Sequence, residues 1–120
     1  MDRILTHTYY IPGTLAADLN IRFKLPCDMQ LVHVSAVGSN AAAAGLTLGN
    51  SGEAAAYMTK KAVGVSGAPA VFDRDDFVGC QFPHISQGTV FTVGLDYDYN
   101  GGGSASASTD ISLVFTFTEG

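Results

Sequence analysis

Hydrophobic and polar residues alternate with a period of two along much of the chain, which is the pattern of half-buried β-strands. The clearest case is Leu19–Leu25, where apolar residues alternate with polar or basic ones until Pro26 ends the run. A second segment, Arg3–Ile11, is rich in Thr and Tyr and stops at the turn pair Pro12-Gly13. Both segments are therefore predicted as strands.

Further stretches have strand character, and turn residues separate most of them. They are Met29–Val37, Leu46–Gly49, Glu53–Val65, Ala70–Phe72, Phe77–Phe82, Val90–Tyr99 and Asp110–Thr118. Glu53–Val65 is ambiguous because its three consecutive alanines favour helix, and we favour an extended conformation. The loop Asn100–Ser108 is rich in Gly and Ser, so we expect the two strands around it to form a hairpin.

Seven or eight strands at this spacing predict an all-β fold, an antiparallel two-sheet sandwich with jelly-roll topology. Because 120 residues allow one core, residues 9–120 are expected to form one domain. Residues 1–8 are expected to precede it as an N-terminal arm. The predicted core consists of large apolar side chains on the inward faces of the strands. They are Leu19, Ile21, Phe23, Leu31, Val34, Leu46, Phe72, Phe91, Val93, Leu95, Ile111, Leu113, Phe115 and Phe117.

Charged residues are scarce, at 14% of the chain against about 25% in an ordinary soluble domain. The net charge of −5 has the wrong sign for binding nucleic acid, and no apolar run approaches the ~20 residues of a membrane span. The first residues lack the apolar stretch of a secretory signal, so we expect synthesis in a cytoplasm without export, and Cys27 and Cys80 as thiols. A surface with so few charges favours burial against partners.

The segment Asp96–Gly101 matches the first six positions of an EF-hand calcium loop, which makes Asp96 and Asp98 candidate ligands. The match fails at the twelfth position, where Ala107 replaces the bidentate Glu. The favoured interpretation is a strand that ends in an Asn-Gly turn, with the two carboxylates in solvent.

A second acidic cluster, Asp73, Asp75 and Asp76 with Arg74 among them, is a further weak calcium candidate. Its simpler interpretation is a charged surface turn that the flanking phenylalanines anchor. We therefore predict no cofactor, and keep calcium at either acidic cluster as the alternative.

No catalytic motif is present in the sequence, and we expect a protein that is not an enzyme. Cys80 and His84 have a zinc-like local spacing, but the second half of a zinc site is missing. A nucleophile elbow and a phosphate-gripping glycine loop are also missing.

The sequence resembles small β-rich virion structural proteins of tailed bacteriophages, over most of its length. The segments that carry the resemblance are Ile11–Asp18, Leu31–Asn40, Phe72–Phe77 and Phe115–Gly120. The resemblance implies a capsid decoration or accessory protein in the virion, which adds to a shell, commonly as a homotrimer. Its partner would be the major capsid protein or another virion protein, and no catalytic residue is implied.

We expect the N-terminal arm and exposed loops to contact neighbouring subunits or the shell. The candidate interface residues are Arg3, Ile4, Leu5, Tyr9 and Tyr10. The competing hypothesis is a carbohydrate- or receptor-binding sandwich in which calcium orders a loop at one of the acidic clusters. Because the chain has no Trp, its tyrosines would have to supply the stacking surface for a sugar.

Overall fold

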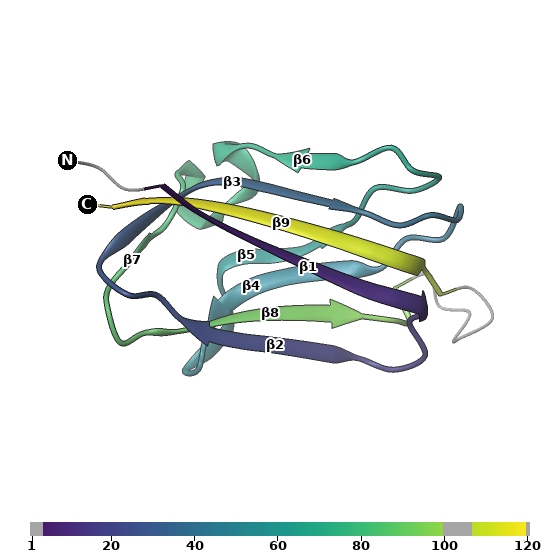
Figure 1. Ribbon diagram of the computed structural model, residues 1–120, viewed down its shortest axis with the longest axis horizontal. Coiled ribbons are helices and arrows are strands. Elements are labelled where there is room, and N and C mark those ends of the chain that lie inside the picture. Colours follow the sequence, from purple (N-terminus) through teal and green to yellow (C-terminus); the bar gives the residue numbers. More distant parts are fainter. Residues whose placement is uncertain (1–3, 100–106, 120) are drawn as a thin grey trace.

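The computed structural model describes residues 4–99 and 107–119. Within these ranges the chain forms nine strands, two short 3-10 helices and no α-helix (Figure 1). The strands are β1 (Ile4–Thr14), β2 (Leu19–Lys24), β3 (Met29–Val37), β4 (Gly45–Asn50), β5 (Glu53–Ala62), β6 (Ala70–Phe72), β7 (His84–Ile85), β8 (Val90–Asp96) and β9 (Thr109–Glu119). The helices are η1 (Arg74–Asp76) and η2 (Val78–Cys80). The described ranges contain no helix that is long and apolar enough to cross a membrane.

The strands form two sheets with antiparallel pairing. Sheet A has the order β1-β9-β3-β6, with β7 also beside β3, and sheet B has the order β2-β8-β4-β5. Apart from the two-residue β7, this leaves four strands in each sheet, and β1 to β4 alternate between the sheets. Such interleaving is the jelly-roll arrangement, so the predicted sandwich and its topology are confirmed.

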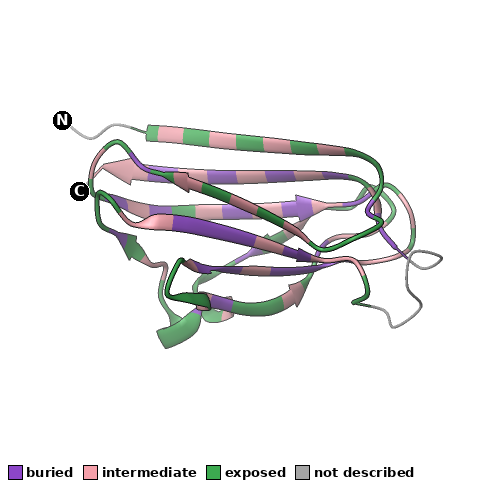
Figure 2. Ribbon diagram, turned by 90° about the horizontal axis from the view of Figure 1, so that it is seen from below, coloured by how far each residue is buried: buried purple, intermediate pink, exposed green. Residues whose placement is uncertain are grey.

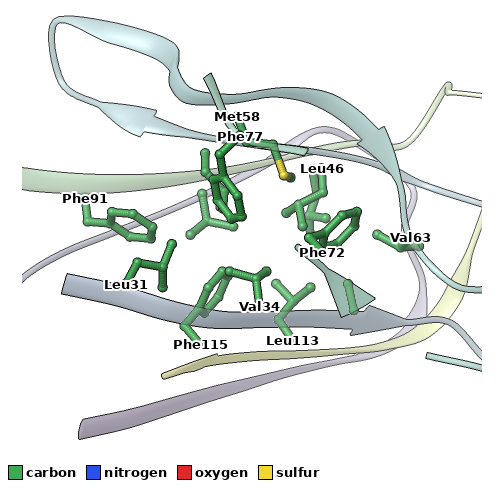
Figure 3. Packing of buried hydrophobic residues seen from close by; sticks show 14 of the residues in the cluster. Leu31, Val34, Leu46, Met58, Val63, Phe72, Phe77, Phe91, Leu113 and Phe115 are labelled. Atoms are coloured by element: carbon green, nitrogen blue, oxygen red, sulfur yellow. The ribbon is translucent and has the colours of Figure 1, made fainter. Parts of the chain in front are cut away.

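The core lies between the sheets and is made by alternate residues of each strand (Figure 3). Leu31, Val34, Leu113 and Phe115 of sheet A face Leu46, Met58 and Phe91 of sheet B across this space. Each such side chain contributes about 1.5–3 kcal/mol when it leaves water. Eleven of the fourteen predicted core residues are buried, and the three on β2 are half-buried because β2 is an edge strand.

Strand predictions hold at most positions, including the ambiguous Glu53–Val65, which forms β5. Phe77–Phe82 is wrong as an extended segment, because η2 occupies its middle and Gly79 has a φ of 79°. Phe77 is nevertheless buried, and its ring packs against Phe82 with 5.0 Å between centroids. The strand from Val90 ends at Asp96, three residues before the predicted end.

The predicted hairpin between the last two long strands is also wrong. β8 belongs to sheet B and pairs with β2 and β4, whereas β9 belongs to sheet A and pairs with β1 and β3. The chain therefore crosses from one sheet to the other between them.

Candidate interaction surface

Charged side chains are distributed unequally between the two sheets. Asp, Glu, Lys and Arg residues in the described strands of sheet A are limited to Asp110 and Glu119, which lie near the two ends of β9. The strands of sheet B carry six, namely Arg22, Lys24, Glu53, Lys60, Lys61 and Asp96. The shortage of charge in the sequence is therefore concentrated on one side of the sandwich.

We define the sheet A outer face as the outward-pointing side chains of β1, β9, β3 and β6 that lie between those two charged ends. They are Ile4, Thr6, Thr8, Tyr10, Ser112, Val114, Thr116, Thr118, Gln30, Val32, His33, Ser35, Val37 and Val71. The register places them in rows across the sheet. One row runs from Thr8 through Val114 and Ser35 to Val71, and the next from Thr6 through Thr116 to His33.

Three large apolar side chains of this face are largely open to solvent: Ile4 is 72% exposed, Tyr10 62% and Val71 63%. Three strands about 4.8 Å apart and about eight residues long, with the three-residue β6 beside them, give a face of roughly 400 Å², within the size range of exposed patches that mark interaction sites. Uncharged hydroxyl and β-branched side chains lose little on desolvation compared with Lys or Glu. The sheet A outer face is thus suited to burial against another protein surface.

β1 supplies the candidate interface residues and forms one edge of sheet A. In Figure 2 it is the uppermost strand, where exposed and half-buried residues alternate along its length. Ile4 and Tyr10 point outward, whereas Leu5 and Tyr9 point inward and pack against the core. Arg3 lies outside the described residues. Residues 4–8, expected as an arm, pair with β9 from Thr118 to Val114.

Asp110 fixes the far end of β1 to the neighbouring elements. Its carboxylate accepts hydrogen bonds from the Gly13 N–H at 2.8 Å, from the Tyr10 hydroxyl at 3.3 Å and from the Ser39 hydroxyl at 3.3 Å. The Gly13 N–H, with help from Tyr10 and Ser39, holds the pKa of this carboxyl below its usual value. The contacts close the sheet where the register between β1 and β9 shifts, between Ile11 and Thr14.

The carboxylates of Asp73 and Asp76, two of the three aspartates in the acidic cluster at η1, have structural partners in the turn. Asp73 is the N-cap of η1 and its Oδ1 accepts from the Asp75 N–H at 3.0 Å. Asp76 Oδ2 accepts from the Asp73 N–H at 2.9 Å, which completes a capping box. The geometry accounts for these carboxylates as caps of a surface turn.

The other acidic candidate, Asp96 and Asp98, also forms a local structure. Asp96 Oδ1 accepts from the Asp98 N–H at 2.9 Å, and Asp96 Oδ2 lies 2.6 Å from Lys60 Nζ. The hydrogen bond from Lys60 lowers the pKa of Asp96, and the same bond raises the pKa of Lys60. Within the described ranges no group of three His, Cys, Asp or Glu side chains is arranged to hold a metal ion.

The Lys60–Asp96 pair lies beside a polar hollow of about 160 Å³ on the outer side of sheet B. Asp18, Asn20 and Thr47 line it together with Gly94. A Cβ at Gly94 would lie 2.5 Å from Thr47 Oγ1, so the absence of a side chain there helps to keep the hollow open. This hollow was not predicted, because its residues come from β2, β4, β5 and β8, and only the topology brings them together.

The two cysteines, Cys27 half-buried and Cys80 exposed, are not joined by a disulfide. The sheet A outer face was missed at the level of sequence, although a signal for it exists. Charged residues are absent from Ile4–Thr14 and from Met29–Val37, and counting charges strand by strand would have found this. Only the pairing order shows that these two uncharged strands both flank β9.

No protein-family model and no curated protein matches this sequence. The structure is similar to a chain of a solved structure described as the cyanophage Pam1 capsid asymmetric unit, with a TM-score of 0.58 and 16% sequence identity. The alignment covers 99% of this chain and 85% of that chain. The two chains thus share the fold over nearly the whole of the present molecule.

Proposed function

We propose that the protein is a non-enzymatic structural subunit of a phage virion, a decoration or accessory protein that coats or stabilises the capsid. The observation that carries this proposal is the sheet A outer face, a broad surface without Asp, Glu, Lys or Arg side chains that presents Ile4, Tyr10 and Val71 to solvent. An isolated soluble domain would normally cover such a face with charges.

The fold is consistent with this role. Jelly rolls occur in capsid proteins as well as in lectins, and the similar chain belongs to a capsid structure. Because the fold alone does not define a function, the uncharged face is the decisive addition. In this proposal the face docks on the major capsid protein or another virion protein.

Assembly into a homo-oligomer is part of the proposal, and a trimer is the number that the family resemblance implies. Repeated copies on a symmetric shell multiply weak contacts, so one face of roughly 400 Å² is sufficient for stable decoration. The mass of the purified protein in solution, compared with 12.5 kDa for one chain, measures the copy number.

The experiment that tests the virion role uses particles from a phage that encodes this chain and from its gene-deleted derivative. We expect the chain in wild-type particles at a constant ratio to the shell protein, and we expect purified protein to bind the deleted particles saturably. Absence of the chain from purified particles, together with failure to bind the deleted particles, would reject the role.

The polar hollow at Gly94 favours a second candidate function, binding of a carbohydrate. Carboxylate, amide and hydroxyl groups converge there, and the ring of Tyr99 lies next to Gly45 and Lys60 on the same side of sheet B. A glycan screen with and without a calcium chelator tests this. Binding that Asn20→Ala abolishes would support the hollow as a sugar site, and loss of binding in chelator would add calcium to it.

A further inference from the structure

The four sheet edges of the sandwich are protected to different degrees. Exposed edge strands attract other strands, and proteins normally block them with charges, prolines, bulges or short length. β2 carries Arg22 and Lys24, β5 carries Lys60 and Lys61, and the opposite edge of sheet A is formed by the short strands β6 and β7. β1 pairs regularly with β9 from Ile4 to Ile11 and has no charge, proline or bulge in that stretch.

The side chains of this stretch are self-complementary. When two copies of β1 run antiparallel with His7 opposite His7, Ile4 of each copy lies opposite Tyr10 of the other, Thr6 lies opposite Thr8, and Leu5 lies opposite Tyr9. The two most exposed apolar side chains of β1 thereby cover each other, and an aromatic side chain meets a β-branched one, a favourable cross-strand pair. Threonine opposite threonine is likewise a favourable pair.

The inward-pointing side chains along the β1 edge of sheet A provide a second observation. Leu5, Tyr9 and Ile11 of β1, together with Leu19, Ile21 and Phe23 of β2, pack against the core but stay only half-buried. His7 lies in this row, with its ring 4.6 Å from that of Phe23. A strand added beside β1 would cover this apolar seam.

An apolar hollow of about 120 Å³ lies at the start of β1. Pro26, Cys27 and Met29 line it with Ile4 and Leu5. It adjoins Ile4, the residue that the His7-centred register places opposite Tyr10 of the second copy. Apolar surface is thus available at the position where that ring would arrive.

We propose that two copies of this chain join through antiparallel β1–β1 pairing centred on His7, so that sheet A continues from one copy into the other. The contact is isologous, because each copy uses the same surface. The inference deepens the proposed function by naming the contact between copies. It rests on the proposed function in one respect, the assembly of the chain into a homo-oligomer. It leaves most of the sheet A outer face free for the shell, and it would join trimers in pairs if a separate threefold contact exists.

Cysteine cross-linking tests the register directly. Ile4→Cys and Tyr10→Cys are made separately in a Cys27→Ala, Cys80→Ser background, and circular dichroism verifies that each variant is folded. Under mild oxidation the mixture of the two should give a covalent dimer of about twice the chain mass. Each variant alone should stay monomeric on a denaturing gel, because identical positions lie about 20 Å apart in this register.

A Thr6→Cys, Thr8→Cys double variant tests the same register if a position-4 or position-10 variant does not fold. Absence of a disulfide in the mixture and in the double variant overturns the pairing. Cross-linking of Ile4→Cys or Tyr10→Cys alone, as efficient as that of the mixture, overturns the His7-centred register. Binding of the Cys27→Ala, Cys80→Ser protein to particles is measured in parallel. Normal particle binding without cross-linking would reject the β1–β1 pairing and leave the virion role intact.

Discussion

The Tyr10 hydroxyl donates a hydrogen bond of 3.3 Å to Asp110 Oδ1, and this contact joins the last regularly paired part of β1 to the start of β9. Asp110 has a φ of 48°, in the left-handed region that Asp tolerates better than most residues. The same carboxylate oxygen accepts the Gly13 N–H, so one side chain closes the sheet beyond the bulge. This end of the uncharged strand is therefore fixed by the one acidic residue near it.

Asp110→Asn should lower the midpoint of urea unfolding at pH 7, because the amide is a weaker acceptor than the charged carboxylate for the Gly13 N–H. The folded-state pKa of Asp110 lies below its unfolded value, so the stabilisation is complete above the unfolded pKa and is lost as pH falls through the folded one. The difference between wild type and variant should thus shrink from pH 7 to pH 2. Asp75→Asn, on the exposed turn of η1, is the matched control. An equal effect of both substitutions would contradict the role of Asp110.

Gly64→Ala should destabilise the fold by roughly 2–4 kcal/mol. A Cβ at this position would lie 2.1 Å from the Ala68 carbonyl oxygen and 2.6 Å from the Ala70 nitrogen, and backbone atoms cannot easily move away. Gly52→Ala is the control, because its Cβ would meet only Asn50 Oδ1, at 3.4 Å. Thermal unfolding followed by circular dichroism measures the stability of both variants. Equal midpoints would show that the backbone of Ala68 and Ala70 does not lie this close to Gly64.

Phe115→Ala should cost about 3–5 kcal/mol, since its ring is fully buried and packs against Phe91 with centroids 5.9 Å apart. Val71→Ala, on the sheet A outer face, should change the unfolding free energy of the free subunit by no more than about 0.5 kcal/mol. Chemical denaturation gives both values. A large loss of stability in Val71→Ala would mean that this face contributes to folding of the single chain and is not reserved for a partner.

Most of the fold could be predicted from alternation, because one buried face and one solvated face impose a period of two on each strand. The failures lie where that signal is absent or ambiguous. Phe77 and Phe82 bracket η2, where a buried ring and a half-buried ring with more exposed residues between them resemble a strand. β9 pairs with β1 and β3, which are remote from it in sequence, and the alternation within one strand does not reveal its neighbours in the sheet.

The candidate surface could be predicted only in part. Ile4 and Tyr10 were candidates on sequence grounds and do point outward, yet residues 4–8 lie in a paired strand. Val71 and Thr116 were not candidates, because nothing local marks them as members of the same face as Ile4 and Tyr10. The polar roles of Asp73 and Asp96 became clear only from their backbone partners.

Affinity for gene-deleted particles, compared between three proteins, tests the role of the sheet A outer face most directly. Thr116→Lys introduces a charge at the centre of this face, and Asn20→Lys introduces the same charge on the outer side of sheet B. Wild type and Asn20→Lys should bind equally, whereas Thr116→Lys should bind at least about 10-fold more weakly, because a buried unpaired charge costs about 2 kcal/mol or more. Equal binding of folded Thr116→Lys and wild type would show that the shell contact lies elsewhere.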